Sequence, residues 1–194
     1  RRERRGVADQ GISLERLTDA AIEPRHWELF FGFYTSTSDR KWGYPYLTRD
    51  FFDRLGGALA GRVVLVMAKK NGRYIGAALN LVGGDAIYGR NWGCRGEHKF
   101  LHFEACYYQA IEHAIANGLA RVEAGAQGEH KIRRGYLPAA TWSAHWIADP
   151  PFRRAVADFL ARETPLMVHE AEELGEHGPF RAGAIGASHS GGPD

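Results

Sequence analysis

The sequence predicts an α/β fold in which a mixed, mostly antiparallel sheet is flanked by helices. Three short strand patterns separated by two tight turns occupy residues 62–92, and the first turn is Asn71-Gly72. Asn-Gly is a strong hairpin signal because both central residues of the favoured turn have positive φ. An amphipathic helix pattern at 101–116 and a strand pattern at 119–124 follow. We therefore expect an antiparallel meander whose third strand lies beside residues 119–124.

Two helices are expected before the meander. Pro24 can open the first, because its missing N–H is not needed in the first helical turn. The apolar stripe of this helix consists of Trp27, Phe30, Phe31 and Tyr34. Residues 35–46 are rich in Ser, Thr, Asp, Gly and Pro and are expected to form a loop. Thr48 is the expected N-cap of a second, short helix that ends at Gly56-Gly57.

The central helix has an apolar face made of Phe103, Tyr107, Ala110, Ile111, Ala114 and Ile115. Asn117-Gly118 supplies its stop, because Gly tolerates the left-handed conformation that ends helices. At 141–147, apolar and polar residues alternate as in a half-buried strand. Asp149-Pro150 is expected to cap a last helix that continues to about residue 177. Residues 181–194 are mostly Gly, Ser, Ala and His, the composition of a mobile tail.

The composition allows one sizeable core, since 44% of the 194 residues are hydrophobic. A net charge of +2 does not by itself favour a nucleic-acid partner. Two cysteines are too few for a disulfide framework and suit a reducing cytoplasm, where we expect the protein. The longest apolar run is six residues, 63–68, so no membrane span is expected. The chain starts with a basic, helical or frayed segment and without Met, so we expect a fragment of a longer protein.

A polar loop after the 119–124 strand carries most of the candidate chemistry. It gathers Glu123, Gln127, Glu129, His130, Lys131, Arg133, Arg134 and Tyr136. Transfer of an acyl group to an amine needs a base, donors for an oxyanion and cations for an anionic substrate. Glu123, Glu129 or His130 could be the base, while Lys131 and the two arginines could clamp a phosphate or carboxylate. The alternative is a solvated charged loop with internal salt bridges.

Three other residues are candidates for lining a substrate site: His102 and Glu104 at the start of the central helix, and His145 in the 141–147 strand. Each could equally be a satisfied structural residue. Zinc-type ligands also recur every four positions at Cys94, His98, His102 and Cys106. On one straight helix the two end residues would be roughly 18 Å apart, too far for a single ion. We therefore predict no metal site.

The order of elements resembles the GNAT (N-acetyltransferase-like) fold. Short segments of the sequence give a more specific resemblance. Six segments resemble the FemAB-like family of bacterial peptidoglycan biosynthesis or recognition proteins: FYTSTSDRKWGYPYLTRDFF, GAALNL, YGRNWGC, LHFEACYYQAIEHAI, VEAGAQGEHKIRRGYLP and SAHWI. The resemblance covers about residues 1–180 and implies one GNAT-like domain there. Family members carry two GNAT-like halves, so this chain resembles the C-terminal half, with the N-terminal half as a missing partner.

A more distant similarity is to the Fem transferases, which move amino acids from aminoacyl-tRNA onto peptidoglycan precursors. Their motif of a lysine and arginine followed by an aromatic residue and Gly lies at the place of HKIRRGY, residues 130–136. GNAT enzymes that use acetyl-CoA carry the pattern [QR]-x-x-G-x-[GA] before the central helix, where backbone N–H groups hold pyrophosphate. Here Arg90 and Gly93 fit this pattern, but Arg95 replaces the last small residue. The departure favours a Fem-like donor and predicts weak binding of acetyl-CoA.

The residues and the resemblance together predict an acyl- or aminoacyltransferase that acts on an amine, possible donors being acyl-CoA and aminoacyl-tRNA. A peptidoglycan precursor is the acceptor that the resemblance implies. Two alternatives stay open. One is a binding module that recognises a cell-wall precursor without chemistry. The other is an aminoacyl-tRNA-binding domain, suggested by the arginines of residues 1–5 and by the basic loop.

Overall fold

The computed structural model describes residues 1–40, 45–125 and 128–180, except for the side chains of residues 37–40 and 129. The chain divides into two compact units, Arg1–Ala126 and Gln127–Asp194. The first unit contains a β-sheet with helices, and the described part of the second is helical or irregular.

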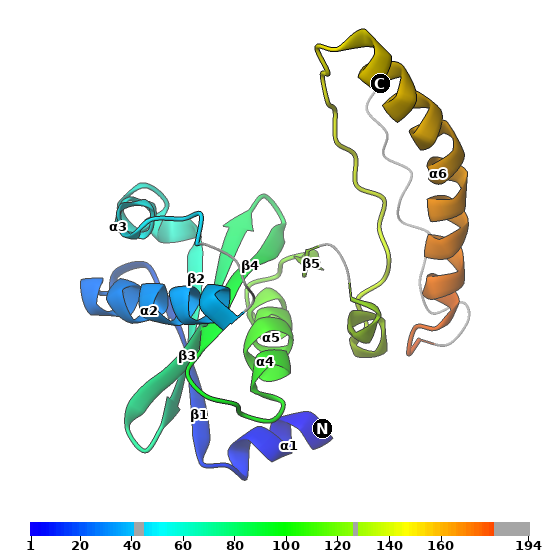
Figure 1. The fold of residues 1–194 in the computed structure, drawn as a ribbon. Coiled ribbons are helices and arrows are strands. Elements are labelled where there is room, and N and C mark those ends of the chain that lie inside the picture. Colours follow the sequence, from blue (N-terminus) through cyan, green and yellow to red (C-terminus); the bar gives the residue numbers. More distant parts are fainter. Residues whose placement is uncertain (41–44, 126–127, 181–194) are drawn as a thin grey trace. The chain divides into compact units, whose positions relative to one another are not determined.

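The first unit is built on a five-stranded sheet (Figure 1). Its strands follow the order β1-β2-β3-β4-β5. They are β1 (Ile12–Thr18), β2 (Val63–Lys70), β3 (Arg73–Gly83), β4 (Ala86–Cys94) and β5 (Arg121–Glu123). The first four are antiparallel neighbours, and β5 is parallel to β4. Asn71 and Gly72 have φ values of 50° and 74° at the β2–β3 turn. The structure therefore confirms the meander and the strand beside its third member.

The strand β1 was not predicted from the sequence, although it pairs with β2 along its whole length. The helix α1 (Arg2–Ala8) precedes β1 and was expected from the basic start. Between the two elements, Gly11 has a φ of 68°, a conformation that suits Gly. Ile12 and Leu14 alternate with Ser13 and Glu15, and this period-2 pattern was the available signal for the strand.

Two helices, α2 (Pro24–Arg40) and α3 (Arg49–Ala58), cover one face of the sheet. Their side chains form one apolar cluster with alternate residues of β2 and β3. The buried members of this cluster are Trp27, Phe30, Phe33, Tyr34, Phe52, Leu55, Val63, Leu65, Met67, Ala77 and Leu79. The hydroxyl of Thr48 accepts the N–H of Phe51 at 3.3 Å, which confirms Thr48 as the N-cap of α3. The predicted apolar stripe of α2 therefore faces the core.

The predicted C-terminal ends of α2 and α3 were both wrong. Residues 35–40 continue α2 instead of forming a loop, and the Thr35 hydroxyl donates back to the carbonyls of Phe31 and Gly32 at 3.1 and 3.2 Å. A polar residue that bonds to the preceding turn is compatible with a helix. Gly56 does not end α3 either. A Cβ there would lie 2.5 Å from Nε1 of Trp27, so Gly56 makes room for that ring.

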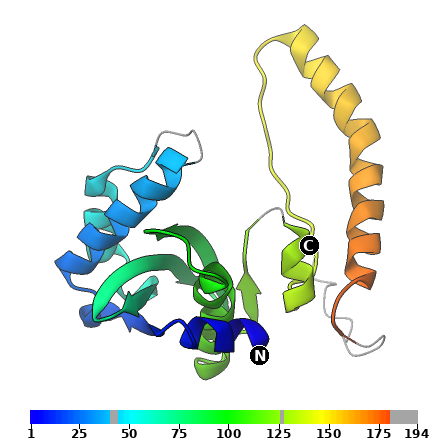
Figure 2. The same cartoon turned by 60° about the horizontal axis from the view of Figure 1, so that its bottom comes forward.

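The opposite face of the sheet is covered by α1 and a continuous central helix (Figure 2). The central helix consists of α4 (Leu101–Phe103), the π-helical segment η3 (Glu104–Tyr108) and α5 (Gln109–Ala116). It ends at Asn117, and Gly118 follows with a φ of 64°, as predicted. Two short 3-10 helices, η1 (Asp19–Ala21) and η2 (Ala60–Arg62), complete this unit. The described part of the first unit is therefore a sheet between two helical layers.

The second unit contains the 3-10 helix η4 (Glu129–Arg134) and the long helix α6 (Pro150–Glu176). Asp149 caps α6 by accepting the N–H of Phe152 at 2.7 Å, as predicted. The predicted strand at 141–147 is wrong, because this segment has no regular secondary structure and Trp142 is 87% exposed. A strand needs a neighbour for its backbone groups, and no strand is present among the described residues of this unit. The predicted mobile tail, 181–194, lies outside the described residues.

Candidate functional site

The strand β4 contains a β-bulge in its middle. The residues on either side of Arg90 pair with Leu79 and Asn80, which are consecutive on β3, so Arg90 has no partner residue there. This extra residue shifts the alternation of the strand, and both Ile87 and Trp92 pack on the central-helix face. Bulges are frequent next to active sites, because they re-aim side chains and interrupt strand pairing.

Beyond Tyr88, the outer edge of β4 has no neighbouring strand in the described part of the chain. β5 pairs only with residues 86–88, whereas β4 continues to Cys94. Glu123, the last residue of β5, lies opposite Tyr88, where the two parallel strands part. Ligands of open α/β sheets bind outside the carboxyl ends of the strands. We call residues 89–94 together with Glu123 the β4 edge, and it is the candidate functional site.

Gly93 packs against α2, and Arg95 contacts both β3 and α2. A Cβ at Gly93 would lie 2.2 Å from the carbonyl carbon and oxygen of Phe33. Arg95 donates its backbone N–H to the carbonyl of Ile75 at 2.8 Å, and its guanidinium lies 5.7 Å from the centroid of the Phe33 ring. Arg90 is exposed. The close approach at Gly93 is thus to another part of the protein, and the cofactor-binding role of these three residues stays a prediction.

The start of the central helix departs twice from regular geometry. Phe100, which precedes it, has a φ of 67°, a value that bulky residues rarely adopt. One turn later comes the π-helical segment η3, and single π-helical turns are frequent at functional sites. His102 lies between these two features. Its ring centroid is 5.8 Å from that of Trp92 and 5.4 Å from that of Tyr107, so His102 packs beside the β4 edge.

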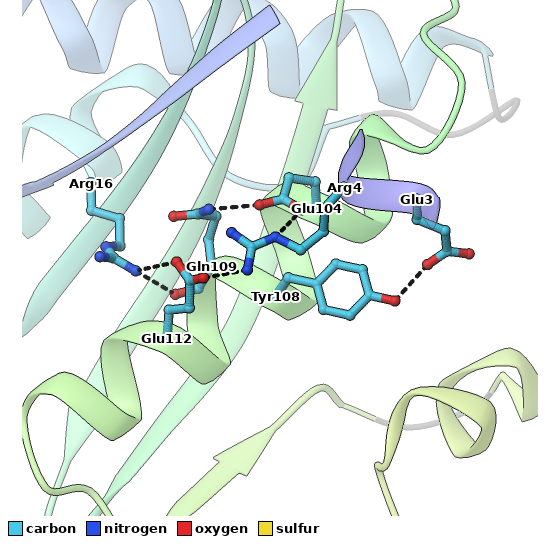
Figure 3. A network of polar contacts seen from close by, with 7 residues as sticks. All are labelled: Glu3, Arg4, Arg16, Glu104, Tyr108, Gln109 and Glu112. Atoms are coloured by element: carbon cyan, nitrogen blue, oxygen red, sulfur yellow. Dashed lines mark hydrogen bonds and ion pairs between the residues drawn. The ribbon is translucent and has the colours of Figure 1, made fainter. Parts of the chain in front are cut away.

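Glu104 is the centre of a polar network on the side of the central helix that faces α1 and β1 (Figure 3). It is only 3% exposed. One carboxylate oxygen accepts from Nε of Arg4 at 3.1 Å, and the other accepts from Nε2 of Gln109 at 2.7 Å. Arg4 also pairs with Glu112, which in turn lies 3.3 Å from Nη1 of Arg16. Both oxygens of the Glu104 carboxylate are therefore engaged by side chains of the protein.

This network joins α1, β1 and the central helix. Tyr108 adds a further link, because its hydroxyl donates to the Glu3 carboxylate at 2.6 Å. Arg4 is therefore paired with two carboxylates of the central helix, which engages one cation of the basic segment that suggested tRNA binding. The sequence pattern indicated Glu104 as a candidate site residue. It did not indicate the partners of Glu104, since Arg4 lies 100 positions away.

Replacing Arg4 with alanine should lower the free energy of unfolding by about 2 kcal/mol. The change leaves the buried carboxylate of Glu104 with Gln109 alone, and a lost hydrogen bond to a charged group costs roughly 1.5–3 kcal/mol. Urea denaturation measures this directly. In a Glu104→Gln background the same change should cost much less, because no buried charge remains. Arg54→Ala is the matched control, since Arg54 and its partner Asp50 are 79% and 71% exposed.

The sequence profile of the FemAB-like family, described as peptidoglycan biosynthesis/recognition, matches residues 1–182. The chain belongs to the FemAB-like family. No protein with a curated description matches it.

Solved structures with a similar fold include acetyltransferases. A GCN5-related N-acetyltransferase from Ralstonia eutropha JMP134 shares 19% identity with a TM-score of 0.52, over 72% of this chain and 100% of that chain. An acetyltransferase from Trypanosoma brucei shares 10% identity with a TM-score of 0.51, over 70% of this chain and 99% of that chain. At these identities the likeness shows the fold alone. The FemAB-like chain therefore has the GNAT fold that the order of elements predicted.

The polar loop of this FemAB-like chain belongs to the second unit from residue 127 onward. Lys131 is half-buried in η4, and burial lowers the pKa of its ammonium group. Ile132 is buried beside it, and Arg134 donates from Nη1 to the carbonyl of His130 at 2.6 Å. His130 and Arg133 are exposed, and Tyr136 is half-buried. Gln127 and the side chain of Glu129 lie outside the described residues. The catalytic and substrate-binding roles of this loop stay predictions.

Two further candidates have clear positions. Glu123 is half-exposed, and its carboxylate lies 3.5 Å from Nη1 of Arg121. His145 is exposed, and its Nε2 lies 2.9 Å from the Ser143 hydroxyl in the segment that forms no strand. The FemAB-like chain thus has Glu123 at the β4 edge and His102 beside it, while His145 belongs to the second unit.

A cluster of titratable residues that sequence reasoning missed lies at the other side of the sheet. His26 is 2% exposed, and its Nδ1 accepts the backbone N–H of Glu23 at 3.0 Å. Its Nε2 therefore carries the proton and faces the Tyr74 hydroxyl at 3.3 Å. That hydroxyl donates to Glu15, which also accepts from Lys69 at 3.0 Å. The available signal was Glu23 followed three residues later by a polar side chain before an apolar run, the spacing of a capping box.

The stability of the FemAB-like chain should fall as the pH drops below about 6.5, the ordinary pKa of His. Burial lowers the pKa of His26 in the folded state, so below that pH the unfolded chain binds a proton that the folded chain does not. Burial also lowers the pKa of His113, which contributes in the same direction. His26→Gln keeps an acceptor for Glu23 and should flatten the slope of unfolding free energy between about pH 5 and 7. An equal slope in the unmodified chain and in His26→Gln would contradict the assignment.

Within the described ranges, no three His, Cys, Asp or Glu side chains lie close enough together to hold a metal ion. The Cys94 thiol donates to the Arg95 carbonyl at 3.4 Å. Burial raises the pKa of the Cys106 thiol, which disfavours the thiolate that a metal would need. None of the helices in the described part of the chain has the length and apolarity that a membrane crossing requires.

Proposed function

We propose that this FemAB-like chain transfers an acyl or aminoacyl group to an amine, and that the amine belongs to a peptidoglycan precursor. The observation that carries the proposal is the β4 edge. There a bulged strand without an outer neighbour among the described residues lies beside the carboxylate-bearing residue Glu123. The family description, peptidoglycan biosynthesis/recognition, supports the choice of acceptor. The GNAT fold, shared with N-acetyltransferases, supports the class of reaction.

In the proposed mechanism the acceptor amine attacks the carbonyl carbon of the donor directly, without a covalent enzyme intermediate. Glu123 takes the proton from the attacking amine, while polar groups of the β4 edge stabilise the tetrahedral oxyanion. The donor oxygen or sulfur then leaves, and an amide is formed. Lys131, Arg133 and Arg134 bind the anionic parts of the substrates. Glu129 and His130 are the other candidate bases, and single substitutions distinguish them from Glu123.

We favour aminoacyl-tRNA as the donor, ahead of acetyl-CoA. The small residue of the CoA-binding pattern is replaced by Arg95, whose backbone N–H is already bonded to Ile75. An N–H that is used inside the sheet is not available to pyrophosphate. The guanidinium of Arg95 also stays near the Phe33 ring, where it fills space between the loop and α2.

Isothermal titration of acetyl-CoA into the protein should therefore show no saturable binding at low micromolar concentrations. Arg95→Ala restores a small residue at the last position of the pattern but leaves the backbone N–H bonded to Ile75, so it should not gain low-micromolar binding of acetyl-CoA either. Low-micromolar binding by the unmodified chain would overturn the choice of donor and leave the proposed reaction class standing.

The proposed function is tested by a transfer assay. The chain is incubated with a soluble, nucleotide-linked precursor peptide that bears a free amine, and with either aminoacyl-tRNA or acetyl-CoA. Mass spectrometry of the peptide should show the mass added by one aminoacyl group, and an amine-blocked peptide should show none. Unmodified peptide with both donors, in a mixture where the peptide binds the protein, would favour the second candidate.

That second candidate is a binding module that recognises a cell-wall precursor without chemistry. One observation favours it: the carboxylate of Glu123 already contacts the guanidinium of Arg121 at 3.5 Å. A carboxylate engaged in this way is also suited to a purely structural role at the end of β5. Precursor binding without turnover would support this interpretation.

A further inference from the structure

The described residues of its own unit leave the apolar face of the helix α6 uncovered. None of its described residues is buried. At 100° per residue its large apolar side chains fall mainly on one broad face. The exposed members are Phe152, Phe159, Leu160, Leu166 and Met167, with exposed fractions between 46% and 68%. Surface helices of globular proteins normally bury such a face, and large exposed apolar patches mark interaction sites.

The charges of α6 are separated along its length. Residues 150–162 contain three arginines and one aspartate, whereas residues 163–176 contain five glutamates and no lysine or arginine. The first turn holds no acidic residue and the last turn no basic one. This distribution is the reverse of what the helix dipole favours, since anions stabilise the N-terminal end and cations the C-terminal end. Pro165, inside the helix, also removes one backbone hydrogen bond.

An isolated α6 is therefore poorly stabilised by its own sequence, and a partner with the opposite charge order would correct this. A second copy of α6 in antiparallel orientation has that order. Its glutamate-rich half would lie along the arginine-rich half of the first copy, and the reverse would hold at the other end. A two-fold interface of this kind uses the same patch on both subunits, and closed two-fold dimers are the commonest oligomers.

We propose that α6 is a dimerisation helix, which pairs antiparallel with α6 of a second copy of this chain through its exposed apolar face. The helix is 27 residues long, which gives a contact line of roughly 40 Å. The arginines Arg153 and Arg162 flank the apolar face in one half of α6, and Glu173 flanks it in the other. Glu163, at the midpoint of the helix, and Glu170 lie within the face, and Glu170 meets the basic half of the partner.

Sedimentation velocity of the full chain over a range of concentrations tests the proposal. The unmodified chain should form dimers. Arg153→Glu combined with Arg162→Glu makes both halves of α6 acidic, and Glu170→Lys combined with Glu173→Lys places two lysines on the interface side of the acidic half, opposite the arginines of the partner. Each double variant alone should dimerise at least about tenfold more weakly, because like charges then face each other across the interface. An equimolar mixture of the two should regain dimers, as heterodimers.

The matched control is Arg54→Glu combined with Arg73→Glu, which changes the net charge equally on exposed residues of the first unit. This variant should dimerise like the unmodified chain. Circular dichroism at matched concentrations shows whether each variant retains its helix content, and Phe159→Glu gives an independent disruption of the apolar face. A chain that stays monomeric at all concentrations overturns the proposal. So does a dimer that both charge reversals leave intact, because it would use another face.

Discussion

Replacing Gly93 with alanine is expected to destabilise the first unit by about 3 kcal/mol, the upper end of the usual cost of overpacking a core. The added Cβ would lie 2.2 Å from the carbonyl carbon and oxygen of Phe33 and 2.6 Å from the backbone nitrogen of Tyr34. These are backbone atoms of a helix, so they cannot move away as the end of a side chain can. Either α2 shifts off the sheet or β4 bends, and both changes disturb fully buried side chains such as Phe33.

Urea unfolding of the full chain, followed by fluorescence, measures this change. Gly57→Ala is the matched control, because a Cβ there meets no atom within 4 Å and the residue lies in α3. Alanine is favoured over glycine inside a helix, so the control should stabilise by roughly 0.5–1 kcal/mol. Equal stability of Gly93→Ala and the unmodified chain would contradict the packing argument.

Local signals in the sequence were enough to predict most of the sheet. The Asn71-Gly72 turn sets the register of β2 and β3, and the stop at Asn117-Gly118 places β5 directly after the central helix. These features depend on neighbours in the chain, so a pattern of a few residues carries them. The strand β1 was not predicted, because its partner β2 lies about fifty residues further on and no turn connects the two.

The candidate site was less predictable, because its contacts are between distant parts of the chain. Residue types near the central helix pointed to Glu104, but its buried state depends on Arg4 from α1. Gly93 fitted a cofactor-binding pattern, yet the close contact that requires a glycine there is with α2. The predicted strand at 141–147 shows the opposite error. Alternation of apolar and polar residues indicates a strand only where a neighbour exists to complete the backbone hydrogen bonds.

Replacing Glu123 with glutamine should lower the rate of acyl transfer by roughly 100- to 10,000-fold, the usual contribution of a general base. Glutamine keeps the length and shape of the side chain but cannot accept the proton of the attacking amine. Because Glu123 is half-exposed at the end of β5, the change should leave the melting temperature almost unaffected. Glu129→Gln and His130→Gln are assayed in parallel, since the sequence offers all three residues as bases. The proposed mechanism expects a large loss of rate only for Glu123.

The ion pair with Arg121 provides a control that separates catalysis from charge. Nη2 of Arg121 lies 2.8 Å from a carboxylate oxygen of Asp85, and Nη1 of the same side chain lies 3.5 Å from Glu123. Asp85→Asn therefore removes one negative charge from the same guanidinium without touching the β4 edge. If Glu123 acts only by pairing with Arg121, the two variants should lose similar amounts of activity. If Glu123 is the base, Asp85→Asn should retain nearly full turnover while Glu123→Gln loses it. Full turnover by Glu123→Gln would transfer the role to Glu129 or His130, whose parallel variants then identify the base.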